Sequence, residues 1–272
     1  MRTTRRLTRR QLLGYSAGGL LAAGLWPGAL RADDAAASKP FHFAVLNDLH
    51  YLDEHCTPWH EGVVKQIKAH KEKVEFCLLV GDLAEHGKAA QFDPVRAIYR
   101  KLDLPLHVVC GNHDWQAEKD RKAYDDLFPE GGNYTFEHRG WQFIGLDSSD
   151  GPKPQVAVRA ETLKWLDDAL PKLDKKKPIV LFTHFPLGPW VIYRAKNADA
   201  VLERFKDYNL QTVFNGHFHA STERHVGTVT LTTNRCCSYS RKNHDGSKEK
   251  GYFLCQAKEG KVTRTFVEYK QG

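Results

Sequence analysis

The sequence predicts an α/β fold whose parallel strands are buried on both faces. Two observations favour it: short, continuous apolar runs alternate with amphipathic segments, and polar residues follow directly where the apolar runs end. A strand with helices over both faces of its sheet is apolar along its whole length, unlike an alternating antiparallel strand. The chain has 272 residues, of which 41% are hydrophobic, so it can bury a sizeable core and wholesale disorder is excluded.

The first half of the chain alternates strand and helix most regularly. A helix is indicated by apolar residues three and four positions apart, as at Phe92, Val95 and Tyr99. Strands are indicated by short apolar runs bounded by polar or glycine-containing segments. In chain order, we expect a strand at Phe41–Asn47, a helix at about Pro58–Ala69, a strand at Phe76–Val80, a helix at Phe92–Leu102, a strand at Leu106–Cys110 and a helix at Gln116–Phe128.

The second half begins with a predicted antiparallel hairpin. Two alternating segments flank Arg139-Gly140, a dipeptide suited to a tight turn. Apolar runs and amphipathic segments then alternate again, and the C-terminal part favours strands around a polar loop. We expect strands at Asn133–His138 and Trp141–Asp147, a helix at Ala160–Leu173, a strand at Ile179–Thr183, a helix at Ala198–Tyr208, a strand at Thr212–Asn215, and further strands within Glu223–Tyr269 around a loop at Tyr239–Gly251.

The excess positive charge is concentrated at the N-terminus. The chain holds 40 Lys and Arg against 33 Asp and Glu, a net charge of +7, but six of the arginines and none of the carboxylates lie in residues 1–32. The remainder therefore has 34 basic and 33 acidic residues. A balance of +1 gives no sign of a basic groove, so no nucleic-acid partner is expected.

Residues 1–32 are typical of a twin-arginine export signal. Thr8–Leu13 read T-R-R-Q-L-L, and an uncharged, glycine-rich apolar run follows from Leu12 to Trp26. This run is shorter than the roughly 20 apolar residues of a membrane span, so no stable span is expected in the mature form. We expect a signal peptide at 1–32 that engages the export machinery, a linker at 33–40, one domain at 41–272, and a periplasmic or extracellular location. The alternatives are an uncleaved anchor and a chance basic start of the chain.

The cysteines and most histidines carry no motif of their own. Cys77 and Cys110 lie in apolar runs and are expected to be buried thiols. Cys236 and Cys237 form either a vicinal disulfide or two buried thiols, and the adjacent Arg235 is either a phosphate ligand or a surface residue. Histidines outside the strand-end motifs are expected to be solvated: His55, His60, His70, His225 and His244.

Five apolar runs end in loops that carry carboxylates, imidazoles or amides. Because the ligand site of an open α/β sheet lies at the carboxyl ends of its strands, these loops are expected to converge. Their nitrogen and oxygen donors suit Mn, Fe or Zn, and the lack of cysteine disfavours a soft metal. The five loops are Asn47-Asp48-Leu49-His50, Gly81-Asp82-Leu83-Ala84-Glu85-His86-Gly87, Gly111-Asn112-His113-Asp114, Thr183-His184 and Asn215-Gly216-His217-Phe218-His219.

In this order, the five motifs resemble those of the calcineurin-like metallophosphoesterases. The family pattern is D-x-H, G-D-x-x-x-x-G, G-N-H-D/E, a lone His and G-H-x-H, and the match spans about residues 41–219. The resemblance implies a four-layer α/β/β/α sandwich with two divalent or trivalent metal ions, Mn, Fe or Zn, at the carboxyl edge of its sheets. It implies that Asp48, His50 and His219 hold the first metal, that Asn112, His184 and His217 hold the second, that Asp82 bridges them, and that His113 lies close to the leaving group.

The sequence differs from two branches of that family. Purple acid phosphatases carry a tyrosine shortly after the G-D motif, and Gly81–Gly87 has none. Phosphoprotein phosphatases carry an Asp-Arg pair late in this motif, where this chain has Glu85-His86. The sequence is more similar to the cyclic-nucleotide phosphodiesterase-like branch, although that branch hosts many substrates. Glu85 is expected to be able to orient His113.

The resemblance implies a dinuclear-metal phosphoesterase that hydrolyses a phosphate mono- or diester. A metal-bound hydroxide would attack phosphorus in line, and His113 would protonate the leaving oxygen or stabilise the transition state. Asn112 and His113 would also contact the substrate. Two alternatives stay open: a non-catalytic metal- or phosphate-ligand-binding protein on the same fold, and a secreted nuclease. The sequence selects neither the natural substrate nor the metal, and it does not choose between monoester and diester.

Overall fold

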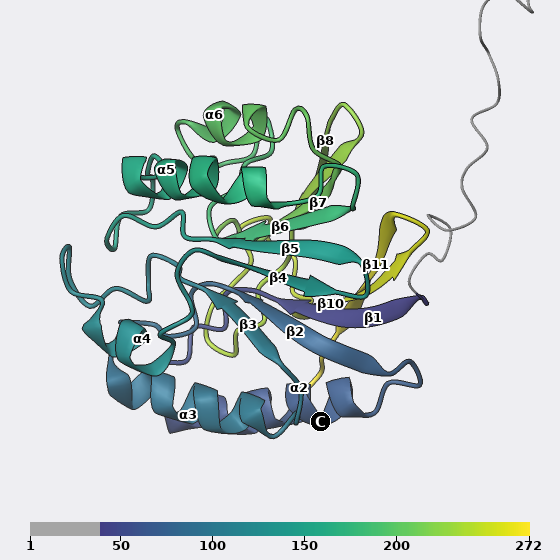
Figure 1. The fold of residues 1–272 in the computed structure, drawn as a ribbon. Helices are drawn as coiled ribbons and strands as arrows, with labels where there is room; N and C mark the ends of the chain where they lie inside the picture. Colours follow the sequence, from purple (N-terminus) through teal and green to yellow (C-terminus); the bar gives the residue numbers. More distant parts are fainter. Residues whose placement is uncertain (1–38) are drawn as a thin grey trace, which may run out of the picture. The chain divides into compact units, whose positions relative to one another are not determined.

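Two mixed β-sheets lie face to face, and helices cover their outer faces (Figure 1). The computed structural model describes residues 39–272, so the signal peptide predicted at 1–32 and most of the linker predicted at 33–40 lie outside the described residues. Within the described range, no helix is long and apolar enough to cross a membrane.

The first sheet has the strand order β11-β10-β1-β2-β3. Strands β1, β2 and β3 are parallel, whereas β10 is antiparallel to β1 and β11 is antiparallel to β10. Helices α2, α3 and α4 pack on its outer face. The elements are β1 (Phe41–Leu46), the short 3-10 turn η1 (Glu54–Cys56), α2 (Thr57–Lys68), β2 (Val74–Val80), α3 (Ala89–Arg100), β3 (Leu106–Val109), α4 (Lys122–Leu127), β10 (Gly251–Lys258) and β11 (Lys261–Glu268).

The second sheet has the strand order β4-β5-β6-β7-β9-β8. Its central strands β5, β6, β7 and β9 are parallel, and the edge strands β4 and β8 are antiparallel to their neighbours. Helices α5 and α6 cover its outer face. The elements are β4 (Tyr134–His138), β5 (Trp141–Leu146), α5 (Ala160–Ala169), η2 (Leu170–Lys172), β6 (Ile179–Thr183), α6 (Ala198–Glu203), β7 (Leu210–Asn215), β8 (Thr222–Val226) and β9 (Val229–Thr233).

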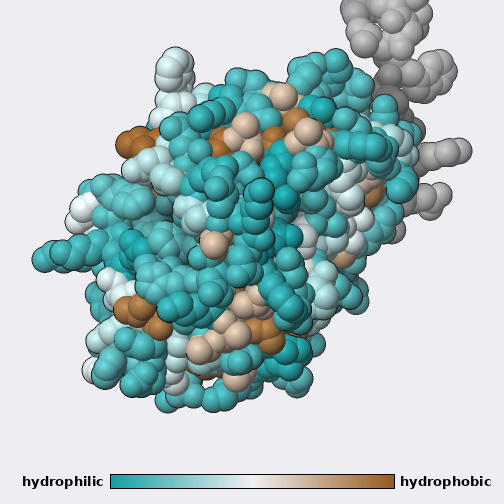
Figure 2. Space-filling view, turned by 90° about the vertical axis from the view of Figure 1, so that its left-hand side faces the viewer, coloured by the Kyte–Doolittle hydropathy of each residue, from teal (hydrophilic) through white to brown (hydrophobic). Residues whose placement is uncertain are grey.

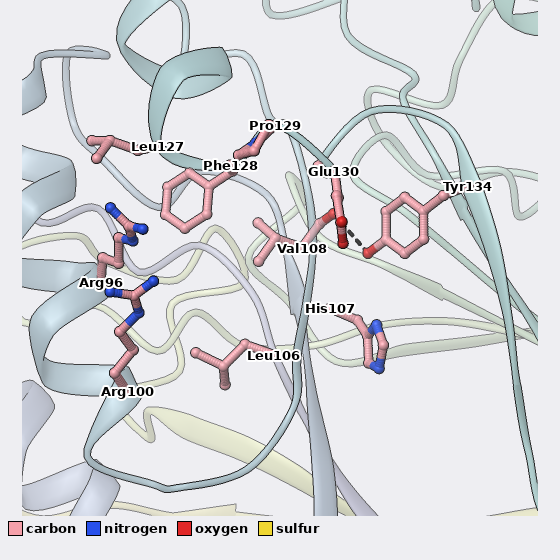
Figure 3. A pocket seen from close by; sticks show the side chains of 11 residues that line it. Arg96, Arg100, Leu106, His107, Val108, Leu127, Phe128, Pro129, Glu130 and Tyr134 are labelled. Carbon is pink, nitrogen blue, oxygen red and sulfur yellow. Dashed lines mark hydrogen bonds between the residues drawn. The ribbon is translucent and has the colours of Figure 1, made fainter.

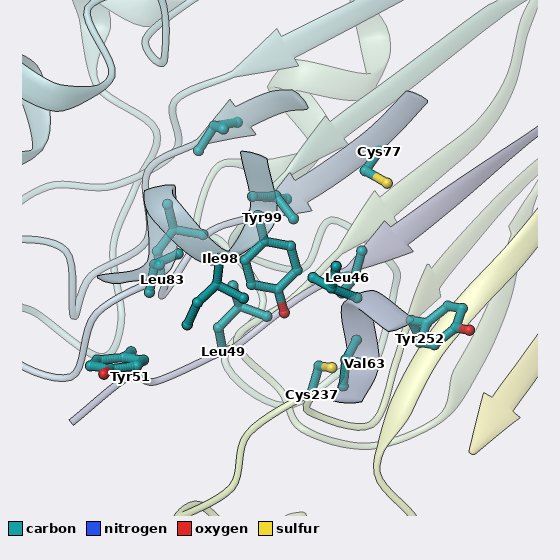
Figure 4. Packing of buried hydrophobic residues seen from close by; sticks show 14 of the residues in the cluster. Leu46, Leu49, Tyr51, Val63, Cys77, Leu83, Ile98, Tyr99, Cys237 and Tyr252 are labelled. Carbon is teal, nitrogen blue, oxygen red and sulfur yellow. The ribbon is translucent and has the colours of Figure 1, made fainter. Parts of the chain in front are cut away.

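Three apolar cores separate the four layers, which confirms the predicted α/β/β/α sandwich. The middle core, between the sheets, is rich in aromatic rings: Phe43 stacks on Phe76 with ring centroids 5.1 Å apart, and Phe143 meets Phe76 edge-on at 5.2 Å. The core beneath the first sheet joins it to α2 and α3, as Figure 4 shows for Leu46 and Tyr99. Each central strand packs against a core on both of its faces and is therefore apolar along its length, as the sequence pattern predicted.

Two predicted helices are shorter than expected. The helix predicted at Gln116–Phe128 begins only at Lys122, because the Gln116 and Ala117 N–H groups donate to the Asp120 carbonyl and close a turn instead. The helix predicted at Ala198–Tyr208 ends at Glu203, because the next N–H groups donate three residues back rather than four.

All six cysteines are buried free thiols. This confirms the prediction for Cys77 and Cys110, and it resolves Cys236 and Cys237 as two buried thiols. Cys77 and Cys237 both lie in the core beneath the first sheet (Figure 4). The thiols therefore serve packing, and burial raises the pKa of Cys77 to about 12.

Candidate dinuclear metal site

The five strand-end loops meet at one edge of the two sheets. Strands β1, β2 and β3 of the first sheet and β6 and β7 of the second end on the same side, to the left in Figure 1. Figure 2 views the molecule from this side, which is mostly hydrophilic with small hydrophobic patches. The polar loops therefore converge where the apolar core between the sheets ends.

The backbone at this edge is strained at several of the predicted site residues. Asp48, His50, Asp82 and His217 have positive φ angles of 54°, 47°, 51° and 63°. Residues other than glycine rarely adopt this left-handed conformation, and such residues cluster at functional sites. The strained turns are held by hydrogen bonds between the loops, since the His50 N–H donates to the Asp82 carbonyl over 2.9 Å.

Glycines next to the candidate ligands make room for this close approach. A Cβ on Gly111 would lie 2.1 Å from Asp82 Oδ1, and a Cβ on Gly81 would lie 2.4 Å from His184 Nδ1. Gly81 also has a φ of 80°, which favours glycine. Only residues without a Cβ at these two positions allow Asp82 and His184 to approach the backbone so closely.

Asp48, His50 and His219 form a first cluster that could hold a metal ion. One donor atom from each lies within 4.8 Å of the others, and all three residues are buried. His50 Nε2 and His219 Nε2 face each other at 3.2 Å, and His219 Nε2 lies 3.1 Å from Asp48 Oδ1. Ring nitrogens and a carboxylate oxygen that converge in this way form a donor set suited to a transition metal.

Asp82, His184 and His217 form a second cluster of the same kind. Asn112 joins it, with its Oδ1 3.3 Å from His184 Nε2. The far nitrogen of each imidazole donates to a carbonyl: His184 Nδ1 to Val80 over 2.9 Å and His217 Nε2 to Pro154 over 2.7 Å. These hydrogen bonds fix the orientation of both rings, so that the remaining nitrogen of each faces the cluster and can bind a metal ion once it is free of a proton.

Asp82 lies between the two clusters. Its Oδ2 is 3.5 Å from His50 Nε2 in the first cluster and 3.3 Å from His184 Nε2 in the second. Its Oδ1 accepts the backbone N–H of His113 over 2.8 Å. The structure thus brings together all seven residues that the sequence predicted as metal ligands, with the predicted bridging residue in the middle.

The charges in these clusters depend on one another. Burial opposes ionisation of Asp48 and Asp82, yet the neighbouring imidazoles His219 and His184 hold the pKa of each carboxylate well below its usual range. Burial would also lower the pKa of the imidazoles, but Asp82 raises the pKa of His184 to about 9 and Asp48 raises that of His219 to about 11. Each cluster therefore balances buried carboxylates with protons that a cation can replace.

His113 lies beside the first cluster and reaches the surface. Its ring meets that of His50 edge-on at 4.7 Å, and its side chain is 31% exposed. Its Nδ1 donates to the backbone carbonyl of Glu85 over 2.9 Å, which leaves Nε2 for a substrate. The prediction that the acidic side chain of Glu85 orients His113 stays a prediction: the hydrogen bond comes from the Glu85 backbone carbonyl, and the carboxylate lies 3.7 Å from Nδ1.

The Glu85 carboxylate contacts two other residues, one of which the sequence did not single out. Glu85 Oε2 lies 3.0 Å from His50 Nδ1, and Arg241 pairs with both Glu85 oxygens, its Nε donating over 2.9 Å. Burial disfavours the Glu85 charge, but His50 and Arg241 lower its pKa to about 2. Arg241 Nη2 is also 3.5 Å from His113 Nδ1. Arg241 thus completes a network behind His50 and His113.

Asp114, the last residue of G-N-H-D, fastens two of the loops together. Its Oδ1 accepts the N–H groups of Leu83 and Ala84, and its Oδ2 accepts that of Gly111, over 2.8 to 3.0 Å. Burial and the nearby Asp82 charge raise its pKa to about 7. Its side chain therefore positions the backbone that carries Asp82 and Asn112.

Three further sequence-based interpretations are settled by the structure. Arg235 is a structural residue, since it donates to Ser247 and stacks over Phe266 at 5.1 Å. His60 is buried rather than solvated, because α2 turns it inward to pair with the Tyr99 hydroxyl over 3.0 Å. His244 is exposed as predicted, but it stacks on His219 with ring centroids 4.6 Å apart.

The polar edge is distinct from a pocket that lies between α3, β3 and the loop before β4. This pocket has a volume of about 320 Å³, and Arg96, Arg100, Phe128 and Tyr134 line it together with β3 (Figure 3). None of the clustered Asp and His residues lines it. This pocket therefore lies apart from the candidate metal ligands.

Comparison with known proteins agrees with this site. A family profile described as calcineurin-like phosphoesterase matches residues 41–221, which include all five motifs. The chain belongs to this family. The family and the donor set identify it as a metal-dependent phosphoric ester hydrolase that uses a dinuclear metal centre.

Several curated proteins are similar to this phosphoesterase, over between two fifths and three quarters of its length. A probable cyclic nucleotide phosphodiesterase of Psychrobacter arcticus is 26% identical over 224 residues, 74% of this chain and 80% of the relative. A probable glycerophosphodiester phosphodiesterase of Arcobacter nitrofigilis is 32% identical over 120 residues, 43% of each chain. Among solved structures, a dimetal phosphatase of Danio rerio superposes with a TM-score of 0.62 at 16% identity, covering 85% of this chain and 99% of that one, and shows the same fold.

Proposed function

We propose that this phosphoesterase hydrolyses a phosphodiester, with Asp48, His50 and His219 holding one metal, Asn112, His184 and His217 the other, and Asp82 bridging both. The observation that carries the proposal is the position of Asp82 between two clusters of buried donors, with His113 beside them. The names of the relatives support a diester, since the matched proteins of Psychrobacter arcticus and Arcobacter nitrofigilis are both called phosphodiesterases.

The chain's own residues supply positioning and a proton. When bound, a metal pair activates water for in-line attack and neutralises charge on the phosphoryl oxygens. Asn112 offers a neutral oxygen at the second cluster, so it adds no further negative charge there. His113 in its charged form gives the proton on Nε2 to the leaving oxygen. The ring is left as the Nδ1–H tautomer, which the Glu85 carbonyl already holds.

We also propose Mn, Fe or Zn as the metals and an exported location. The donor set of imidazole, carboxylate and amide is compatible with all three metals. The export proposal rests on the arginine pair and apolar run of residues 1–32, and replacing Arg9 and Arg10 together with lysine would test it. Cell fractionation is expected to find the wild-type protein outside the cytoplasm and the double variant inside it.

The activity is tested with the full-length protein, loaded with Mn²⁺, on bis(p-nitrophenyl) phosphate and p-nitrophenyl phosphate. The diester is expected to be hydrolysed faster, with loss of activity on metal chelation. His113→Ala should keep two metals per chain and lower kcat by about 10²- to 10⁴-fold, the usual contribution of a general acid. His225→Ala, an exposed histidine that pairs with Glu223, is the matched control.

Four outcomes would contradict the proposal in whole or in part. Faster hydrolysis of the monoester would make the protein a phosphatase. No hydrolysis of either ester by protein with two bound metals would favour a binding protein. Cleavage of DNA, with an affinity that falls steeply with salt, would favour the nuclease. Loss of both metals in His113→Ala would contradict its role as a proton donor alone.

A further inference from the structure

The loop that follows β6 exposes an unusual group of apolar side chains. In residues 188–194, which we call the rim loop, Trp190, Ile192 and Tyr193 are 92%, 57% and 40% exposed. Large aromatic and aliphatic residues are normally buried, and several of them exposed together mark a binding surface. The rim loop begins four residues after His184, a candidate ligand of the second metal.

The rim loop is held in a strained backbone conformation. Trp190 and Tyr193 have positive φ angles of 63° and 60°, which bulky residues seldom adopt. Neighbouring side chains fix its base: Arg224 Nε donates to the Pro189 carbonyl over 3.2 Å, and Arg194 Nε donates to the Leu187 carbonyl over 3.0 Å. Strain that the surroundings maintain, in a loop with exposed aromatic rings, is typical of a ligand-binding segment.

The rim loop adjoins the metal clusters. The Tyr193 ring meets that of His217 edge-on, with centroids 5.2 Å apart, and lies 6.1 Å from His244. His244 in turn stacks on His219. Tyr193 and His244 therefore form an aromatic border that passes from the second cluster to the first. His113, by contrast, packs against His50.

We propose that the rim loop binds a flat, apolar ester group of the substrate, and that this is the group retained on phosphorus. The proposal rests on the phosphodiesterase function above. His113 protonates the leaving oxygen, so the ester group that stays on phosphorus must point away from His113. The Tyr193–His244 border is the aromatic surface that adjoins the metal clusters away from His113. Stacking on an exposed aromatic ring favours an aryl or nucleobase-like group over a short alkyl group.

The test compares two diesters with the same leaving group, bis(p-nitrophenyl) phosphate and methyl p-nitrophenyl phosphate. Only the retained group differs, so the ratio of their kcat/KM values reports its recognition. We expect the wild-type protein to prefer the aryl diester and Tyr193→Ala to reduce that preference about tenfold, mainly through KM. Tyr193→Phe keeps the ring and should keep the preference. Val226→Ala removes an apolar side chain of similar exposure, 41%, from the β8–β9 hairpin and serves as the control.

A binding measurement gives a readout besides turnover. Phenylphosphonate and methylphosphonate bind through the same phosphonate group, and calorimetry should show a tighter Kd for the phenyl compound that Tyr193→Ala and Trp190→Ala both weaken. Equal kcat/KM values for the two diesters in wild type, with normal hydrolysis, would overturn this proposal and leave the phosphodiesterase function intact. Failure of the wild-type protein to hydrolyse either diester would instead overturn that function. An unchanged ratio in Tyr193→Ala, with vesicle or protein binding lost, would assign the rim loop to a macromolecular partner.

Discussion

The core between the two sheets and the polar edge where their strands end are built on opposite principles. Phe43 on β1 is fully buried among stacked and edge-on aromatic rings. A few residues further along the same segment, Asp48 and His50 are equally buried, but both are polar and both have left-handed backbone angles. Packing of the β1 side chains thus stabilises the fold, whereas the strained, polar loop that follows β1 costs free energy.

This difference shows how the fold maintains its site. A left-handed residue other than glycine costs about 1–3 kcal/mol, and four candidate ligands adopt that conformation. A fully buried large apolar side chain contributes about 1.5–3 kcal/mol. The aromatic core can therefore offset the strain at its end, and the buried side chains of Leu49 and Leu83 anchor two of the strained loops in the core beneath the first sheet. Changes at the edge should then affect chemistry, and changes in the core should affect stability.

The largest expected effect on chemistry comes from Asp82→Ala. Asp82 lies between both clusters, so its loss should reduce hydrolysis to background and prevent stable binding of both metals. The fold should persist, because the core between the sheets does not include Asp82. Metal analysis, a diester assay and circular dichroism measure the three quantities. Asp168→Ala, an exposed carboxylate on α5, is the control. Two metals retained in Asp82→Ala would disprove its bridging position.

The matching change in the core is Phe143→Ala. Phe143 is fully buried, with ring centroids 4.7 to 5.8 Å from those of Phe136, Phe76 and Phe43. Its loss should reduce the free energy of unfolding by about 3–5 kcal/mol, as for other buried phenylalanines. Urea denaturation measures this loss, and Phe143→Leu should lose less. The kcat of the folded, metal-loaded protein should change little. If kcat fell in both variants in proportion to the loss of stability, the claim that the core affects only stability would be wrong.

Much of this arrangement could be predicted from the sequence, for a physical reason. Strand ends, glycines and the motifs after them are local features, so the seven candidate ligands and His113 are readable one segment at a time. The helix at Gln116–Phe128 was predicted too long, because the turn closed by the Asp120 carbonyl depends on backbone bonds that its apolar spacing does not reveal.

Residues whose roles depend on distant contacts were missed. Arg241 lies 156 positions from Glu85, in a polar loop with no motif, so only the fold shows that they pair. The arginine singled out instead, Arg235, is only six residues away and packs against Phe266. His60 looked like a surface histidine, because nothing local indicates its contact with Tyr99 on α3.

Arg241→Ala tests the network behind the ligands and should have a smaller effect. It leaves the Glu85 carboxylate without its cation, so His50 and His113 should be less well oriented. We expect a decrease in kcat of about tenfold, at the lower end for residues that support metal ligands, with both metals retained. Arg235→Ala is the matched control from the same segment. A change confined to KM would assign Arg241 to substrate binding instead.

The last prediction concerns pH, and the expected effect on stability has opposite signs with and without metal. In metal-free protein, the pKa of His184 is about 9 and that of His219 about 11, both above the unfolded value of 6.5. A raised pKa contributes stability that is complete below pH 6.5 and is lost as pH rises through the folded value. Urea midpoints of metal-free protein should therefore decrease from pH 6 to pH 9.5. His184→Gln combined with His219→Gln should flatten the decrease.

With saturating metal, the trend should reverse between pH 6 and pH 8. Metal binding displaces the protons on His184 and His219, so a higher pH strengthens binding and adds stability by mass action. The two midpoint curves are thus expected to diverge as pH rises. Parallel curves would mean that the buried protons and the metal do not compete. In that case, the charged groups of the polar edge would contribute to folding stability, as the aromatic rings of the core do, but not to metal binding.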